Sequence, residues 1–361
     1  MILKKAYGPT TIAAGAALLM TLSMVISESL VARTFGTYAL RAFGGDADSI
    51  LVPVLGVGLI VFAYMMNISG NRAVGLLSVI MATLKVGGIT LFGAAGLWAS
   101  GITFDASVGE AGATGFVASV ALSILAFKGF TTITNSGAEV TDPHRNVGRA
   151  IVASIAICAV VYLLVAFAVG SSLPLDRIVA AKNYAFAEAA QPTLGRTGFY
   201  LTVALALVAT ASGLIASVFA VSRMLTMLTD MKMIPHSHFG MPGTIKDHTL
   251  VYTVVIAGFL TVFFDLSRIA SLGAFFYLVM DIIIHVGVFR HLRHEIAARG
   301  WVLLTAIALD AVVLMVFAAS KWQSDTLIVG LGLTFMALVF VFEWAFLVRH
   351  PTSEIQHEKR E

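Results

Sequence analysis

A polar stretch at 126–143 interrupts an otherwise apolar chain, and its residues could bind a small molecule. Lys128 and Gly129 precede a run that is rich in threonine. A membrane-spanning helix normally satisfies its backbone polar groups internally, but glycine weakens a helix by about 1 kcal/mol and threonine hydroxyls compete for backbone partners. A break here would free N–H and C=O groups that can hold a zwitterion. The alternative is a continuous helix whose hydroxyls bond to neighbouring turns.

Two other groups of ionisable residues lie within apolar runs. Lys85 is midway along the run 73–98, where a charge costs several kcal/mol unless it is paired or neutralised. A buried lysine can take up and release a proton; the alternative is snorkelling, or pairing with Asp281 or Glu28. Asp281 and His285 are four residues apart and share one helical face. For these two we expect a hydrogen-bonded polar pair rather than a catalytic site.

The composition excludes soluble enzymes, disordered chains and disulfide scaffolds. Of 361 residues, 58% are hydrophobic and 12% are charged, with a mean hydropathy of +0.92. The charged share is about half that of soluble globular proteins. The apolar runs are long and do not alternate, which predicts an all-α polytopic membrane protein rather than a barrel. We expect ten spans, at roughly 10–32, 50–67, 73–98, 114–137, 150–171, 197–222, 250–265, 269–289, 301–319 and 325–347.

Loop charges predict the orientation of the chain. With the N-terminus inside, the inner loops carry about twice as many lysines and arginines as the outer loops, which favours cytoplasmic N- and C-termini. We expect one transmembrane domain over 1–361, with 350–361 as a polar cytoplasmic tail, in the plasma or inner membrane. The formal net charge of +3 follows these loops and does not indicate a nucleic-acid partner.

Three segments resemble the amino acid–polyamine–organocation (APC) family of permeases. The run Phe127-Lys128-Gly129-Phe130, followed by Gly-Ala-Glu-Val-Thr-Asp-Pro at 137–143 and then Arg145, resembles the sixth helix and the following loop of that family. The segment 222–235 is similar to the eighth helix and its loop, and Lys85 lies where the fifth helix is expected. The resemblance implies a LeuT-like inverted-repeat fold, in which ten of twelve spans form two five-helix repeats, and transport by alternating access.

The alignment on this sixth-helix motif makes the first span correspond to helix three. We therefore expect this chain to lack the first two family helices, including the glycine-rich break that clamps the substrate carboxylate, and to have an incomplete first repeat. Two alternatives to transport stay open. The chain could be a membrane subunit or remnant without transport activity, or an intramembrane enzyme, for which Asp281 and His285 are the only support and a nucleophile is lacking.

The resemblance also assigns roles to individual residues. Lys85 would take the region of sodium in sodium-coupled relatives, which favours proton coupling or exchange, and Glu139 with Arg145 would form an inner gate of charge pairs. Leu125 and Thr131 replace an aromatic and an acidic residue that are frequent in the family, which argues against a dibasic substrate. Lys128 would contact an acidic substrate group or repel cations, or else point away. The residues expected to bind the substrate are Leu125, Phe127, Lys128, Gly129, Phe130 and Thr131.

The remaining polar residues do not indicate a metal centre. His236, His238 and His248 crowd one loop without a convincing zinc-binding spacing, so we expect neither a metal nor a cofactor, and no enzymatic activity. Asp310 and Glu343 lie in the last two spans, where we expect packing or oligomer contacts; a homo-oligomer stays open. The expected partners are a small amino acid or amine and the lipid bilayer.

Overall fold

The computed structural model describes residues 2–69, 71–101, 112–127, 129, 133, 140–234 and 243–349. Within these ranges the chain is helical and contains no strand. Among the described residues, nine helices are long and apolar enough to cross a membrane, and α5 (Ala113–Phe127) is a shorter apolar helix. Each of the ten expected spans therefore contains a helix within the described residues; for the span 114–137 this is α5, and 128, 130–132 and 134–137 are not described. The long ones are α2 (Thr11–Ala42), α3 (Leu51–Ile68), α4 (Asn71–Ser100), α7 (Pro143–Ser172), α9 (Ala185–Asp230), α10 (Ile245–Phe263), α11 (Leu266–Gly287), α12 (Gly300–Ser324) and α13 (Thr326–Arg349).

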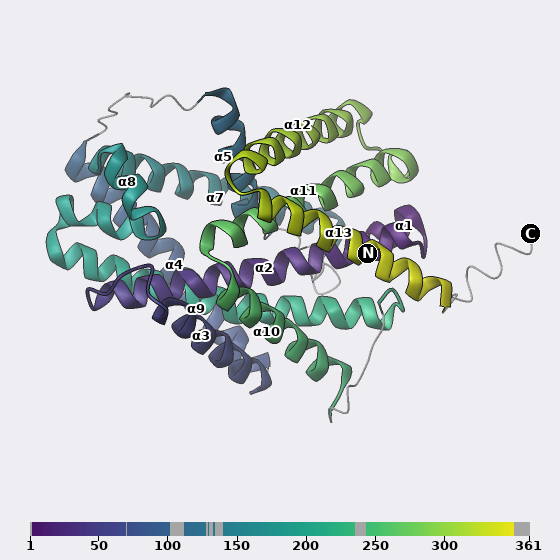
Figure 1. Ribbon diagram of the computed structural model, residues 1–361, viewed down its shortest axis with the longest axis horizontal. Helices are drawn as coiled ribbons and strands as arrows, with labels where there is room; N and C mark the ends of the chain where they lie inside the picture. Colours follow the sequence, from purple (N-terminus) through teal and green to yellow (C-terminus); the bar gives the residue numbers. More distant parts are fainter. Residues whose placement is uncertain are drawn as a thin grey trace, which may run out of the picture.

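Helix α2 runs through the middle of the molecule (Figure 1). It packs against α3, α9, α10, α11 and α13, and its buried residues are mostly alanine, glycine, serine and threonine. Its first turn is capped by the hydroxyl of Thr10, which accepts a hydrogen bond from the Ala13 N–H. Small side chains let several helices approach one axis closely, and α2 is consequently the centre of the core.

Two glycines permit the closest contact between α2 and α3. A Cβ atom added at Gly36 would overlap the backbone carbonyl of Val52. A Cβ atom at Gly56 would lie 2.9 Å from the carbonyl oxygen of Ala32 and 3.0 Å from Cγ2 of Thr261. Any larger residue at Gly36 would therefore push the two helices apart.

Helices extend further between the spans than the sequence predicts. We expected a loop over 172–196, but the chain forms α8 (Leu175–Ala181), a 3₁₀ turn (Lys182–Tyr184) and the start of α9. The alanine-rich start of α9 has high helix propensity, and the 46-residue helix bends at Gly195, whose φ is 68°. Arg33, which follows the expected span 10–32, lies inside α2 and donates to the carbonyl of Thr261 at 2.9 Å and to that of Phe264, at the end of α10.

The remaining helices lie on two sides of this core. Helices α4 and α7 pack on α9 and on one another, while α12 and α13 lie against α11 (Figure 1). The short α1 (Ile2–Tyr7) is attached to the end of α11, because the Tyr7 hydroxyl donates to the carbonyl of Ile283 at 2.7 Å. A π-helical turn at Val288–Leu292 follows α11.

Candidate functional site

A cavity of about 480 Å³ lies between α2, α5, α9 and α11. Among the described lining residues, Ser27 and Ser217 carry the polar side chains, and the others are apolar or glycine. Small residues of α9 leave much of the space open. The other lining residues are Met24, Leu30, Val31, Leu122, Leu125, Ala126, Gly129, Ala216, Ala220 and Ala270.

A buried carboxyl group lies directly behind this wall. Glu28 is fully buried, and the Ser217 hydroxyl donates to its Oε1 at 3.2 Å. Ser217 comes from α9 and Glu28 from α2, so the hydrogen bond joins two of the four helices around the cavity. The sequence placed Glu28 in a span but gave no reason to place it beside a binding site, because its partner is 189 residues away.

The residues expected at the sixth-helix motif are only partly described. Leu125 and Gly129 line the cavity, and a Cβ atom at Gly129 would have no neighbour within 4 Å among the described residues. Phe127 instead contacts the ring of Tyr162 on α7 edge to face, with the ring centroids 5.1 Å apart. Lys128, Phe130 and Thr131 lie outside the described residues. Helix α5 ends at Phe127, and the break expected between about 127 and 132 stays a prediction.

Lys85 is the middle residue of α4 and is half-buried. In the described part of the chain, no carboxylate oxygen lies within 4.0 Å of its ammonium group. The expected alternative of pairing with Asp281 or Glu28 is therefore wrong: Asp281 faces His285, and Glu28 accepts from Ser217. Lys85 also lies outside the cavity wall.

Of the two residues expected to form the inner gate, Glu139 and Arg145, the structure describes only Arg145. Arg145 lies in the first turn of α7 and is exposed. Glu139 is outside the described residues. The pairing of the two side chains therefore stays a prediction.

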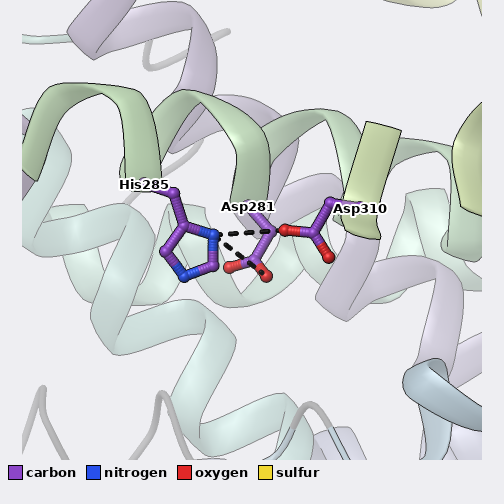
Figure 2. A group of neighbouring side chains, drawn as sticks. All are labelled: Asp281, His285 and Asp310. Atoms are coloured by element: carbon purple, nitrogen blue, oxygen red, sulfur yellow. Dashed lines mark hydrogen bonds and ion pairs between the residues drawn. The ribbon is translucent and has the colours of Figure 1, made fainter. Parts of the chain in front are cut away.

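Three ionisable side chains from α11 and α12 point toward one another (Figure 2). Nδ1 of His285 lies 3.2 Å from Oδ2 of Asp310 and 3.8 Å from Oδ2 of Asp281. The spacing correctly predicted that Asp281 and His285 lie near one another, but the expected hydrogen bond between them is wrong: His285 bonds instead to Asp310 on α12, a partner that the sequence did not indicate. Glu343 on α13 is fully buried within the chain and so serves internal packing; neither of its carboxylate oxygens is hydrogen-bonded to a described residue.

Comparison with known proteins gives the family. The family model described as amino acid permease matches residues 2–346, nearly the whole chain. The chain belongs to the amino acid permease family. This permease is 27% identical over 325 residues to the inner membrane transport protein YbaT of Escherichia coli (strain K12), covering 89% of the chain and 75% of that relative. It is 26% identical over 345 residues to the uncharacterized protein MJ0609 of Methanocaldococcus jannaschii, covering 94% of the chain and 78% of that relative.

Family membership confirms the resemblance seen in the sequence. This permease is a multi-pass membrane protein and a transporter of small molecules rather than an enzyme. The alternative of an intramembrane enzyme, which rested on Asp281 and His285, is therefore wrong.

Proposed function

We propose that this permease transports a small amino acid or a related amine by alternating access, with the cavity between α2, α5, α9 and α11 as its binding site. The observation that carries the proposal is the place of Gly129. It lies on the cavity wall just after the end of α5, next to the segment in which the sequence predicts a helix break. Free backbone N–H and C=O groups at such a break would face a ligand in the cavity.

The chemistry of the wall supports a short, mostly apolar substrate. Apolar side chains and glycine form nearly all of the wall that the structure describes, which favours an aliphatic side chain on the substrate. The hydroxyl of Ser217 can accept a hydrogen bond from a substrate ammonium group while it donates to Glu28. The negative charge of an ionised carboxylate behind the wall would attract that ammonium group.

Several finer assignments belong to the same proposal. Lys85 would couple transport to protons or to exchange of substrates, and Glu139 with Arg145 would form the inner gate. The chain would act as one transmembrane domain over 1–361 with 350–361 as its tail, both termini in the cytoplasm. The relative named an inner membrane transport protein supports the same membrane for this chain.

Filling the cavity tests the binding site. Ala216 lines the cavity, whereas Ala204 is an exposed residue elsewhere on the same helix. We expect Ala216→Phe to weaken amino acid binding to the purified chain at least about tenfold, since the ring occupies the site, while Ala204→Phe binds as the unsubstituted chain does. Binding is measured with a panel of radiolabelled amino acids, and uptake with proteoliposomes.

Three results would contradict the proposal. If the Ala216→Phe variant binds amino acids as the unsubstituted chain does, the binding site lies elsewhere. Binding of no amino acid or amine in the panel, or binding without uptake, would favour a subunit or remnant without transport activity.

The role of Lys85 is tested by the pH dependence of uptake. We expect uptake to be independent of sodium and to depend on pH, and Lys85→Ala to flatten the pH dependence while binding survives. Lys85→Arg keeps a positive charge that is not released in this pH range, so we expect it to behave like the alanine variant. If the pH dependence of uptake is unchanged in Lys85→Ala, Lys85 has a structural role and does not couple transport to protons.

A further inference from the structure

The cluster of Asp281, His285 and Asp310 contains more acceptors than its own donor can satisfy. Nδ1 of His285 can donate one hydrogen bond at most. Oδ2 of Asp310, at 3.2 Å from Nδ1, is close enough to accept it. Oδ2 of Asp281, at 3.8 Å from the same nitrogen, is beyond hydrogen-bond distance. Among the described residues no hydrogen bond to the Asp281 carboxylate is found. The cluster thus presents a second carboxylate to a position that a cation could take.

The depth of the cluster makes this excess of negative charge costly. Asp310 is ten residues after the start of α12 at Gly300, which corresponds to roughly 15 Å along the helix and about half of a bilayer core. The exposed fractions of the side chains are 22% for Asp281, 26% for His285 and 14% for Asp310. Two carboxylates beside a neutral imidazole carry a charge of −2, which one divalent cation neutralises.

We propose that Asp281, His285 and Asp310 bind one divalent transition-metal ion of the Zn²⁺ class. One ligand atom from each residue lies within 4.8 Å of the other two. Zinc–nitrogen and zinc–oxygen bonds of about 2.0–2.2 Å put tetrahedral ligands roughly 3.4 Å apart, and the distances of 3.2 and 3.8 Å bracket this value. The metal would replace the proton on Nδ1, and a fourth position would be left for solvent.

The donor set selects the class of ion. Magnesium and calcium prefer six or more oxygen ligands, whereas an imidazole with two carboxylates and an open position suits zinc and its first-row neighbours. The spacing of four residues brings Asp281 and His285 to one side of α11, the same helical spacing that is used by paired zinc ligands in other proteins. Asp310 completes the set from α12.

The bound ion would connect a wall of the cavity to a peripheral helix. Helix α11 contributes Ala270 to the cavity, and the ion would fix this helix to α12. Because metal ligation joins the two helices more strongly than one hydrogen bond, the ion would restrict any movement of α11 relative to α12.

Zinc binding to the purified full-length chain tests the proposal. The protein is stripped with EDTA in detergent and titrated with Zn²⁺ by calorimetry, and bound metal is counted after gel filtration. We expect one ion per chain, with Asp281→Asn and Asp310→Asn each weakening affinity at least tenfold. Affinity should also fall between pH 7.5 and pH 5.5, because protons compete for the ligands.

A matched control removes other histidines. His236→Ala with His238→Ala deletes two loop imidazoles and should leave the affinity unchanged. Both asparagine replacements preserve shape, and Co²⁺ absorption in the visible range gives a second readout of the coordination. If either asparagine variant fails to fold, the other decides the question. Absence of a stoichiometric ion, undiminished affinity in a folded asparagine variant, or loss of affinity in the loop variant would each overturn the proposal.

Discussion

In helices α2 and α7 the relation between hydropathy and burial is the reverse of that expected in a soluble protein. The most apolar 18-residue window of α7 has a mean hydropathy of 2.8 and contains no buried residue, whereas the corresponding window of α2 has a mean hydropathy of 1.7 and is 72% buried. The more apolar helix is thus the one on the outside. In this pair the more apolar helix faces outward, where lipid would lie, and the less apolar helix packs among other helices.

The lipid around the protein explains this difference in burial. Lipid tails are as apolar as leucine, so burying an apolar helix in the protein gains no hydrophobic energy. Close packing and hydrogen bonds between helices decide which helix is central. Helix α2 supplies both: Ser29 donates to the carbonyl of Ala257 on α10 at 3.0 Å, and Ser23 donates to that of Gly273 on α11 at 3.2 Å.

The largest effect should come from widening the contact between α2 and α3. In Gly36→Ala the new methyl group meets backbone atoms of Val52, and these atoms cannot move aside as the end of a flexible side chain can. We expect a loss of about 3 kcal/mol in the free energy of unfolding, measured by denaturant titration in mixed micelles.

Gly58→Ala is the matched control on α3, because a Cβ atom there would have no neighbour within 4 Å. We expect this variant to be unchanged or more stable by up to about 1 kcal/mol, from the higher helix propensity of alanine. Equal losses in the two variants would show that close approach does not hold α2 in the centre.

A pair of leucines compares the two regions directly. Leu19 on α2 is fully buried, and Leu163 on α7 is 57% exposed. We expect Leu19→Ala to cost about 2 kcal/mol, because a cavity remains in the core. Leu163→Ala should cost under about 0.5 kcal/mol, since lipid or detergent fills the space. The same denaturant titration measures both, and a larger loss in Leu163→Ala would reverse the comparison.

A small effect should also come from breaking an ion pair at one end of the core. Asp325, between α12 and α13, accepts a hydrogen bond from Nε of Arg268 at 2.7 Å. This hydrogen bond lowers the pKa of Asp325 below its usual value. A lowered pKa in the folded state contributes stability above the unfolded pKa of about 3.9, and this contribution is lost as the pH falls through the folded pKa.

We therefore expect Asp325→Asn to lower the stability at pH 7 by under about 1 kcal/mol, because the pair is partly exposed. The difference from the unsubstituted chain should shrink as the pH falls below about 4. Melting temperatures between pH 3 and pH 7 measure this, and a difference that grows in acid would contradict the assigned pKa direction.

The sequence by itself determined the class of protein and the elements. Long apolar runs separated by polar turns predicted ten helices, and each predicted span contains a helix in the part of the chain that the structure describes. The segment from Phe127 to Pro143 indicated the permease family, which the match over residues 2–346 confirmed. These features are local, since twenty residues suffice to show whether a segment can cross a bilayer.

Only the tertiary structure decided which residues meet. The sequence placed Glu28, Ser217 and Asp310 in separate helices and gave no distance between them. Their contacts, Ser217 with Glu28 and His285 with Asp310, join helices at separations of 189 and 25 residues. Such contacts depend on how closely small residues such as Gly36 let helices approach. The hydropathy of a span reports little about these contacts, because every span faces an apolar neighbour, whether lipid or protein.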